Sequence, residues 1–221
     1  MLRQGMSYEA VIFDFDGTLA DSARDVWISL AFAAAEEGGR LREGFDSRAS
    51  NLSLPLEDIF AAIEPFPGLE RFESFAASVE RHYRRVNRYE MTELYPGIPE
   101  LLRRLKSEGV TSCIVSQKPE EALSRILRVK HWEAWFDAWL SPDSFPDLRL
   151  GKAARISLLL EDRLKGRRAV YIGDSWTDAV AARESGIDFI GAAYGDGDPE
   201  LLAAERPLRL VRDPRALGEC L

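Results

Sequence analysis

AVIFDFDGT, residues 10–18, is the stretch of sequence that decides the fold of this chain. Its first four residues are apolar and run directly into two carboxylates, Asp14 and Asp16, which are followed by Gly17. A short, continuous apolar run is typical of a strand that is buried on both faces of a parallel sheet. Because side chains alternate along an extended chain, Asp14 and Asp16 point to the same side. We therefore expect a buried strand with two acids at its carboxyl end.

Two further apolar runs repeat this pattern. Residues 113–115 lead into Ser116, and residues 170–173 lead into Asp174. Helical patterns lie between the runs, at residues 98–107, 153–164 and 177–185. Alternating strands and helices predict an α/β fold with a doubly wound, mostly parallel, Rossmann-like sheet. Ligands bind such sheets beyond the carboxyl ends of the strands, which is where Asp14, Ser116 and Asp174 are expected.

The segment from residue 21 to residue 93 breaks the alternation. It contains helical patterns at residues 26–37, 56–63 and 72–83 but no convincing strand. A segment of this length inside a compact domain is expected to fold as a unit of its own. We predict a catalytic core made of residues 1–20 and 94–221, with residues 21–93 inserted after the first strand as a helical cap.

Composition and charge exclude several classes of function. The net charge is −8, which argues against binding to nucleic acid or to an anionic membrane surface. We find no apolar segment long enough for a signal peptide or a membrane span, so we expect a cytoplasmic protein. The 2 cysteines do not form a disulfide framework. Composition leaves open whether the chain is a monomer or a homodimer.

The acids at residues 14–18 have one competing interpretation, a calcium-binding loop. Such a loop needs glycine at its sixth position and glutamate at its twelfth, where this chain has Leu19 and Asp25. The calcium loop is therefore excluded. Two carboxylates as close as Asp14 and Asp16 are both ionised readily only if a cation or a proton lies between them.

Asp174 and Asp178 form a second pair of acids. Asp174 alone is better explained as a helix N-cap, but the two pairs together favour a site for a hard cation, magnesium. Ser116 is explained either as a capping residue or as a phosphate ligand at a helix start with free amides. Lys152 begins another helix and is either solvated or directed into the same site.

These motifs, in this order, resemble the haloacid dehalogenase superfamily. More narrowly, DFDGTLADS (14–22), YPGIPELLRRL (95–105) and IGDSWTDAVAARESG (172–186) resemble the phosphoglycolate-phosphatase-like hydrolases. The resemblance covers nearly the whole chain. It implies a magnesium-dependent phosphatase that hydrolyses a small-molecule phosphate monoester through an aspartyl-phosphate.

The resemblance also implies a role for each matching residue. Asp14 would be the nucleophile, and Asp16 would be the general acid and then the general base. Ser116 and Lys152 would hold the transferring phosphoryl oxygens, and Lys152 is the only motif cation that we expect near the acids.

Metal and substrate ligands follow in the same way. The resemblance implies that magnesium would be bound by four acids, Asp14, Asp16, Asp174 and Asp178. Asp16 would contribute its backbone carbonyl, and Asp178 would support the metal site. Thr18, Gln117 and Arg48 are the candidates for substrate binding. Gln117 stands where relatives often have asparagine, and Ser53 stands where they often have glycine in a specificity loop.

Alternatives within and outside this superfamily remain. Dehalogenases lack the second acid, Asp16, and phosphonatases need a cap lysine, which residues 21–105 do not contain. Sugar-phosphate mutases carry a histidine near the place of Val26, so a mutase is disfavoured but stays open. A phospho-aspartate signalling or binding domain is the alternative from another class, but such a domain lacks a cap and an acid like Asp16.

Overall fold

The computed structural model describes residues 8–47, 51–52, 54–145 and 150–221. The chain divides into two compact units. The first, which we call the sheet unit, consists of the residues up to Asp21 together with Glu93–Leu221. The second, the helical unit, is Ser22–Thr92. The two boundaries lie one residue from those that the sequence suggests.

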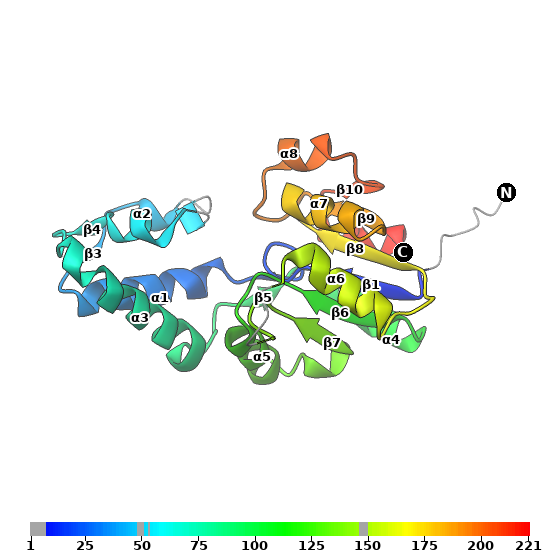
Figure 1. The fold of residues 1–221 in the computed structure, drawn as a ribbon, viewed down its shortest axis with the longest axis horizontal. Helices are drawn as coiled ribbons and strands as arrows, with labels where there is room; N and C mark the ends of the chain where they lie inside the picture. Colours follow the sequence, from blue (N-terminus) through cyan, green and yellow to red (C-terminus); the bar gives the residue numbers. More distant parts are fainter. Residues whose placement is uncertain (1–7, 48–50, 53, 146–149) are drawn as a thin grey trace. The chain divides into compact units, whose positions relative to one another are not determined.

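A six-stranded sheet forms the centre of the sheet unit (Figure 1). Its strands are joined in the order β10-β9-β8-β1-β6-β7, and every pair is parallel. The predicted α/β fold with a parallel sheet is therefore confirmed. The strands are β1 (Ala10–Phe13), β6 (Thr111–Val115), β7 (Ala138–Leu140), β8 (Ala169–Gly173), β9 (Asp188–Ala192) and β10 (Arg209–Val211).

The three strands predicted from apolar runs, β1, β6 and β8, are neighbours in this sheet. Every residue of β1 and β8 is buried, which explains why their sequences show no polar alternation. Strands β7, β9 and β10 were not predicted. The tryptophan-rich segment that ends in β7 has helix-like or mixed spacing, yet Ala138–Leu140 is an edge strand.

Helices cover the sheet. They are α4 (Ile98–Ser107), α5 (Glu120–Val129), α6 (Lys152–Glu161), α7 (Trp176–Glu184) and α8 (Pro199–Ala204), with short 3-10 helices η5 (Glu133–Trp135) and η6 (Pro214–Cys220). Helices α6 and α7 lie side by side over one face of the sheet (Figure 1). There Ile156 and Ala182 join Ile12 and Tyr171 in one apolar core. Helix α4 has the bounds predicted from its apolar stripe, of which Leu101, Leu102 and Leu105 are buried.

A short antiparallel pair of strands lies where the chain leaves the sheet unit and returns to it. Strand β2 (Ala20–Asp21) pairs with β5 (Glu93–Leu94), so the chain leaves this unit and returns to it through adjacent strands. The two ends of the insertion are therefore held together within the sheet unit.

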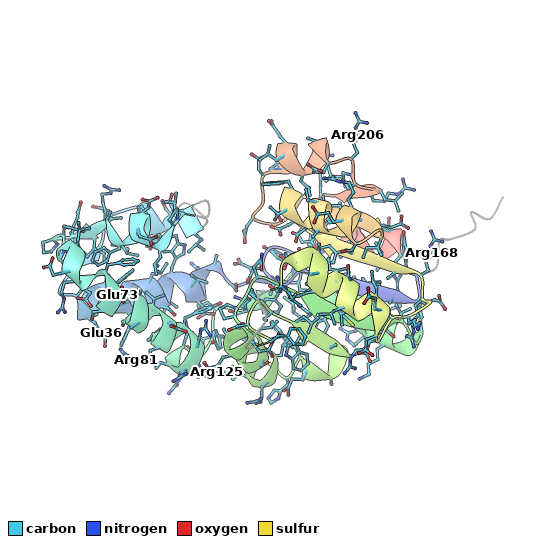
Figure 2. The ribbon with its side chains drawn as sticks, in the orientation of Figure 1. Glu36, Glu73, Arg81, Arg125, Arg168 and Arg206 are labelled. Carbon is cyan, nitrogen blue, oxygen red and sulfur yellow. The ribbon has the colours of Figure 1, made fainter. Side chains whose placement is uncertain are left out.

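The helical unit contains α1 (Ala23–Glu36), α2 (Leu56–Phe60), α3 (Phe72–Arg81), the 3-10 helices η1 (Phe45–Ser47) and η3 (Leu69–Arg71), and the π-helix η4 (His82–Val86). Its core gathers aromatic and aliphatic side chains from the first three of these, among them Trp27, Phe60 and Phe75. At its surface Arg81 of α3 and Glu36 of α1 form an ion pair of 2.6 Å (Figure 2).

The expectation that the insertion contains no strand was wrong in one respect. Strands β3 (Arg40–Leu41) and β4 (Ile63–Glu64) form a two-residue antiparallel pair. Strands this short leave no periodic pattern in a sequence, so only their pairing reveals them. In the described parts of both units, every helix is too short or too polar to cross a bilayer.

Candidate active site

Three strands end side by side and set out the candidate site. Asp14 follows β1, and its backbone amide donates to the carbonyl of Ile172 in β8 at 2.8 Å. Ser116 follows β6, and its amide donates to the carbonyl of Leu140 in β7 at 3.1 Å. Asp174 follows β8. The parallel register thus places three predicted site residues at the carboxyl edge of the sheet.

A tight turn after β1 lets the backbone leave this edge. Gly17 has a φ of 73°, and its amide donates to the carbonyl of Ala20 at 3.1 Å. A Cβ atom on Gly17 would lie 2.2 Å from Oδ2 of Asp174. The glycine is therefore needed both for the positive φ and for the close approach of the first motif to the last one.

A cluster of acids lies at the centre of the edge. Asp14, Asp174 and Asp178 are buried, and each offers a carboxylate oxygen within 4.8 Å of the other two. Asp178 is held by a capping box at the start of α7. Its amide donates to Ser175 Oγ at 3.2 Å, and the amide of Ser175 donates to Asp178 Oδ2 at 3.1 Å. The N-cap of α7 is therefore Ser175, and Asp174 is left for another role.

Lys152 lies against these acids. It is the first residue of α6, as expected, and Gly151 is the N-cap of that helix. Its Nζ is 3.2 Å from Asp14 Oδ1 and also donates to Asp178 Oδ1. Burial alone would lower the pKa of Lys152, but the two carboxylates outweigh it and the pKa is raised. Lys152 is therefore a buried cation beside the predicted nucleophile.

The carboxylates themselves hold protons unusually tightly. Burial is the largest cause and raises the pKa of Asp14 to about 7, with Lys152 opposing this and the neighbouring carboxylates adding to it. Burial and then the charge of Asp178 raise the pKa of Asp174 to about 7. Burial first, and then repulsion between the carboxylates, therefore favours their protonated forms, and a bound cation would oppose both effects.

Asp174 is also oriented by the loop after β9. Its Oδ2 accepts hydrogen bonds from the backbone amides of Asp196 and Gly197, each at 2.9 Å. Sequence reasoning did not find this contact, because the partners are amides, which carry no residue signature.

Ser116 is buried, but it does not lie at a helix start. Helix α5 begins at Glu120 with Pro119 as its N-cap, so Ser116 neither caps that helix nor benefits from its first amides. Its Oγ accepts from the backbone amide of Lys118 at 3.2 Å. The hydroxyl is thus held by its own loop.

Arg155 holds the backbone of that loop, a role that the sequence did not predict. This side chain is fully buried in α6 and donates to the backbone carbonyls of Ser116 and, at 3.2 Å, Leu140. It also donates to Oε1 of Gln117 at 2.6 Å. Gln117, a predicted substrate ligand, therefore uses its amide oxygen within the protein.

Lys118 is a second cation of the site. Its Nζ lies 3.0 Å from Asp16 Oδ1. The sequence indicated Lys152 as the only motif cation near the acids, and the loop after β6 adds Lys118, a lysine from outside the motifs.

The remaining substrate candidates lie differently. Thr18 is fully buried, its carbonyl accepts from Tyr194 Oη at 2.8 Å, and its hydroxyl has no hydrogen-bond partner among the described residues. Arg48 lies outside the described residues, as does Ser53.

The acid cluster fits a magnesium ion. Its donors are all carboxylate oxygens, the ligands of hard cations. Asp14 Oδ1 is buried and its ion-pair partner is Lys152 Nζ at 3.2 Å, which leaves the carboxylate with lone pairs for a ligand. Asp14, Asp174 and Asp178 would hold the ion. The carboxylate of Asp16 is outside the cluster and is paired with Lys118.

Comparison with known proteins agrees with the family resemblance that the sequence motifs show. The family model described as haloacid dehalogenase-like hydrolase matches residues 11–192. A phosphoglycolate phosphatase of Pseudomonas syringae pv. tomato is 27% identical over 98% of this chain and 80% of its own length. A structure from Clostridium difficile, assigned as a phosphatase, has a TM-score of 0.84 and 24% identity over 97% and 99% of the two chains, which shows the fold. A structure from Thermotoga maritima, assigned as a β-phosphoglucomutase, has a TM-score of 0.72 and 27% identity over 95% and 96%.

Proposed function

This chain belongs to the haloacid dehalogenase-like hydrolases. We propose that it is a magnesium-dependent phosphatase of that family and acts through a phosphorylated Asp14. One observation carries the proposal. A buried carboxylate follows the central strand, with a lysine 3.2 Å away and two further carboxylates within 4.8 Å. The groups that such a mechanism requires, a nucleophile, a phosphate-binding cation and metal ligands, would thus all come from one edge of the sheet.

In the first step a carboxylate oxygen of Asp14 attacks the phosphorus atom of a phosphate monoester. The bond between phosphorus and the ester oxygen breaks, and Asp16 gives its proton to the departing alkoxide. An aspartyl-phosphate on Asp14 and a free alcohol result. Covalent catalysis of this kind divides one difficult displacement into two easier steps.

In the second step Asp16, now ionised, accepts a proton from water. The water oxygen attacks phosphorus, the acyl-phosphate bond breaks, and inorganic phosphate leaves. Asp14 is regenerated as a carboxylate and Asp16 as an acid, so the cycle is balanced without any further reactant.

The other residues stabilise charge. Lys152 Nζ and Ser116 Oγ would donate to the phosphoryl oxygens, whose charge must be compensated during transfer. A magnesium ion held by Asp14, Asp174 and Asp178 would supply two positive charges to the nucleophile and the phosphate. It would also keep the carboxylate of Asp14 ionised despite its raised pKa.

For the substrate we propose a small-molecule phosphate monoester. The phosphoglycolate phosphatase from Pseudomonas syringae supports this class, and 2-phosphoglycolate is the first compound to test. We propose that the helical unit acts as the cap expected from the sequence. Thr18, Gln117 and Arg48 remain proposed substrate contacts.

A sugar-phosphate mutase is the second candidate. The likeness to the Thermotoga maritima structure assigned as a β-phosphoglucomutase favours it, because the identity and coverage are similar to those of the phosphatase relatives. Product analysis separates the two candidates. A phosphatase releases inorganic phosphate, whereas a mutase returns an isomeric sugar phosphate.

The test is a panel of phosphate monoesters, including 2-phosphoglycolate and hexose phosphates, with magnesium and with a chelator. We expect magnesium-dependent release of phosphate from at least one member. Glu200→Gln, a change at an exposed surface acid, is the control and should leave this activity unchanged. Turnover only to isomeric sugar phosphates, or equal phosphate release in the chelator, would contradict the proposal.

A further inference from the structure

Lys118 lies in the loop after β6, and its side chain is buried. Its side chain is only 3% exposed, whereas that of Asp16, which it contacts, is 39% exposed. An ammonium group is taken out of water only where other groups compensate its charge. Among the groups that do so here are the carboxylate of Asp16 and the ring of Phe15, whose centroid lies 5.6 Å from Nζ.

The backbone of Lys118 is fixed as well. Its amide donates to Ser116 Oγ at 3.2 Å, so one short loop holds a predicted phosphate ligand and the partner of the predicted acid. The position of Nζ is therefore tied to the place where the phosphoryl group is expected.

The contact determines how Asp16 can present a proton. A half-exposed aspartate without a fixed partner changes rotamer easily, because its terminal torsion is broad. A charge-assisted hydrogen bond to Oδ1 fixes the orientation of the whole carboxyl group. Since an ammonium group only donates, Oδ1 acts as an acceptor, and a proton on this group has to be on Oδ2.

We propose, building on the proposed function, that Lys118 is a positioning residue that holds the carboxyl group of Asp16 with Oδ2 directed to the leaving-group oxygen. Lys118 then acts through Asp16. It is needed when the leaving group is an alkoxide, which must receive a proton, and not when the leaving group departs as a stable anion.

The experiment compares Lys118→Met with the wild type on two substrates. Rapid acid quench measures the formation of phosphoenzyme from the best alkyl phosphate of the panel and from p-nitrophenyl phosphate. With the alkyl phosphate we expect a fall of about tenfold or more, because general acid catalysis and its alignment are impaired. With p-nitrophenyl phosphate we expect a change below about threefold, since nitrophenolate needs no proton to leave. Lys165→Met, at an exposed lysine of the sheet unit, should change neither rate.

A second arm removes the partner. In the Asp16→Asn background, Lys118→Met should have no further effect on phosphoenzyme formation from either substrate. If Lys118→Met melts below the assay temperature, Lys118→Gln, which keeps a donor without the charge, is compared in the same way.

An equal loss on both substrates that persists in the Asp16→Asn background would overturn this inference. That result leaves the proposed function intact as long as the wild type releases phosphate with magnesium and Asp16→Asn discriminates between the two leaving groups. If the wild type released no phosphate with magnesium and Asp16→Asn did not discriminate between the two leaving groups, the proposed function itself would be wrong.

Discussion

Gly197 lies so close to Asp174 that a Cβ atom on the glycine would be 2.2 Å from the backbone carbonyl oxygen of Asp174. Its amide holds Oδ2 of the same aspartate at 2.9 Å. Gly195 is packed as tightly, because a Cβ there would lie 2.1 Å from the carbonyl oxygen of Gly17. The loop after β9 thus fits against the acid cluster only without side chains at these two positions.

Gly197→Ala and Gly195→Ala should therefore weaken magnesium binding. The clashes are with backbone atoms, which cannot move aside cheaply, so the loop must shift and Asp174 loses its orientation. We expect the affinity for magnesium to fall about tenfold or more, as is usual when groups that orient metal ligands are lost. Isothermal titration calorimetry measures this directly. Gly218→Ala, whose nearest neighbour is a flexible arginine end at 3.4 Å, is the control and should bind as the wild type does.

Magnesium should stabilise the folded protein. An ion that binds only the folded state adds about 2.7 kcal/mol at a hundredfold excess over its dissociation constant. We expect the Tm to rise with magnesium, Asp174→Asn to reduce the rise, and Glu200→Gln to leave it unchanged. Sodium chloride at matched ionic strength is the control for screening. A rise of equal size with sodium would mean that the acid cluster does not bind magnesium specifically.

The effect of magnesium should depend on pH. The pKa values of Asp14 and Asp174 are about 7 in the folded protein, against 3.8 ordinarily. Between these values the folded state keeps protons that the unfolded chain has released. Their contribution to the stability of the metal-free protein is therefore full below the ordinary value and is lost as the pH rises through about 7.

Magnesium needs the ionised carboxylates, so the rise in Tm that it produces should be small at about pH 5.5 and large at about pH 8. Melting curves with magnesium and with a chelator at both pH values measure it. In the chelator, the Tm of Asp174→Asn should fall less between these pH values than that of the wild type. A magnesium effect that is larger at the acid pH would contradict the assignment of the shifted pKa values to this site.

Arg155 should matter for stability and for substrate affinity. Arg155→Met leaves the carbonyl of Ser116 without this donor, at a cost of about 1–3 kcal/mol if that acceptor stays unsatisfied, whereas the carbonyl of Leu140 keeps the amide of Ser116 as a donor. Urea denaturation should show the lower free energy of unfolding, and the loop of Ser116 should bind phosphate more weakly. Arg163→Met removes an arginine that donates at 3.2 Å to the carbonyl of Asp137 from an exposed position, and it should cost much less.

The sequence was sufficient where a pattern has one physical cause. The strand Ala10–Phe13 and the helix Ile98–Ser107 have the predicted bounds, because a run buried on both faces and a regular apolar stripe each favour one structure. The strand Ala138–Leu140 was missed since it is only three residues long and its one tryptophan, Trp139, suits several environments. Strand Asp188–Ala192 begins with an acid and contains a glycine, which hides its buried residues.

The site could be predicted as far as its residues carry a motif. The acids and Lys152 were found in this way, and the structure brings Asp14, Asp174, Asp178 and Lys152 together. Arg155 was missed because an arginine in a helix normally faces solvent, and its burial depends on carbonyls that only the fold brings near. The backbone amides of Asp196 and Gly197 that hold Asp174 could not be predicted, because every residue except proline has such an amide.

The position of the phosphate in acid-quenched enzyme tests the central claim most directly. Asp16→Asn, mixed with p-nitrophenyl phosphate and magnesium, should accumulate phosphoenzyme, because its leaving group needs no acid while the attacking water lacks its base. Peptide mapping by mass spectrometry should place the phosphate on Asp14, and hydroxylamine should remove it. Asp14→Asn should form no phosphoenzyme and show no turnover, since an amide cannot make the acyl-phosphate bond. Phosphate on any other residue, or full activity in Asp14→Asn, would contradict the account.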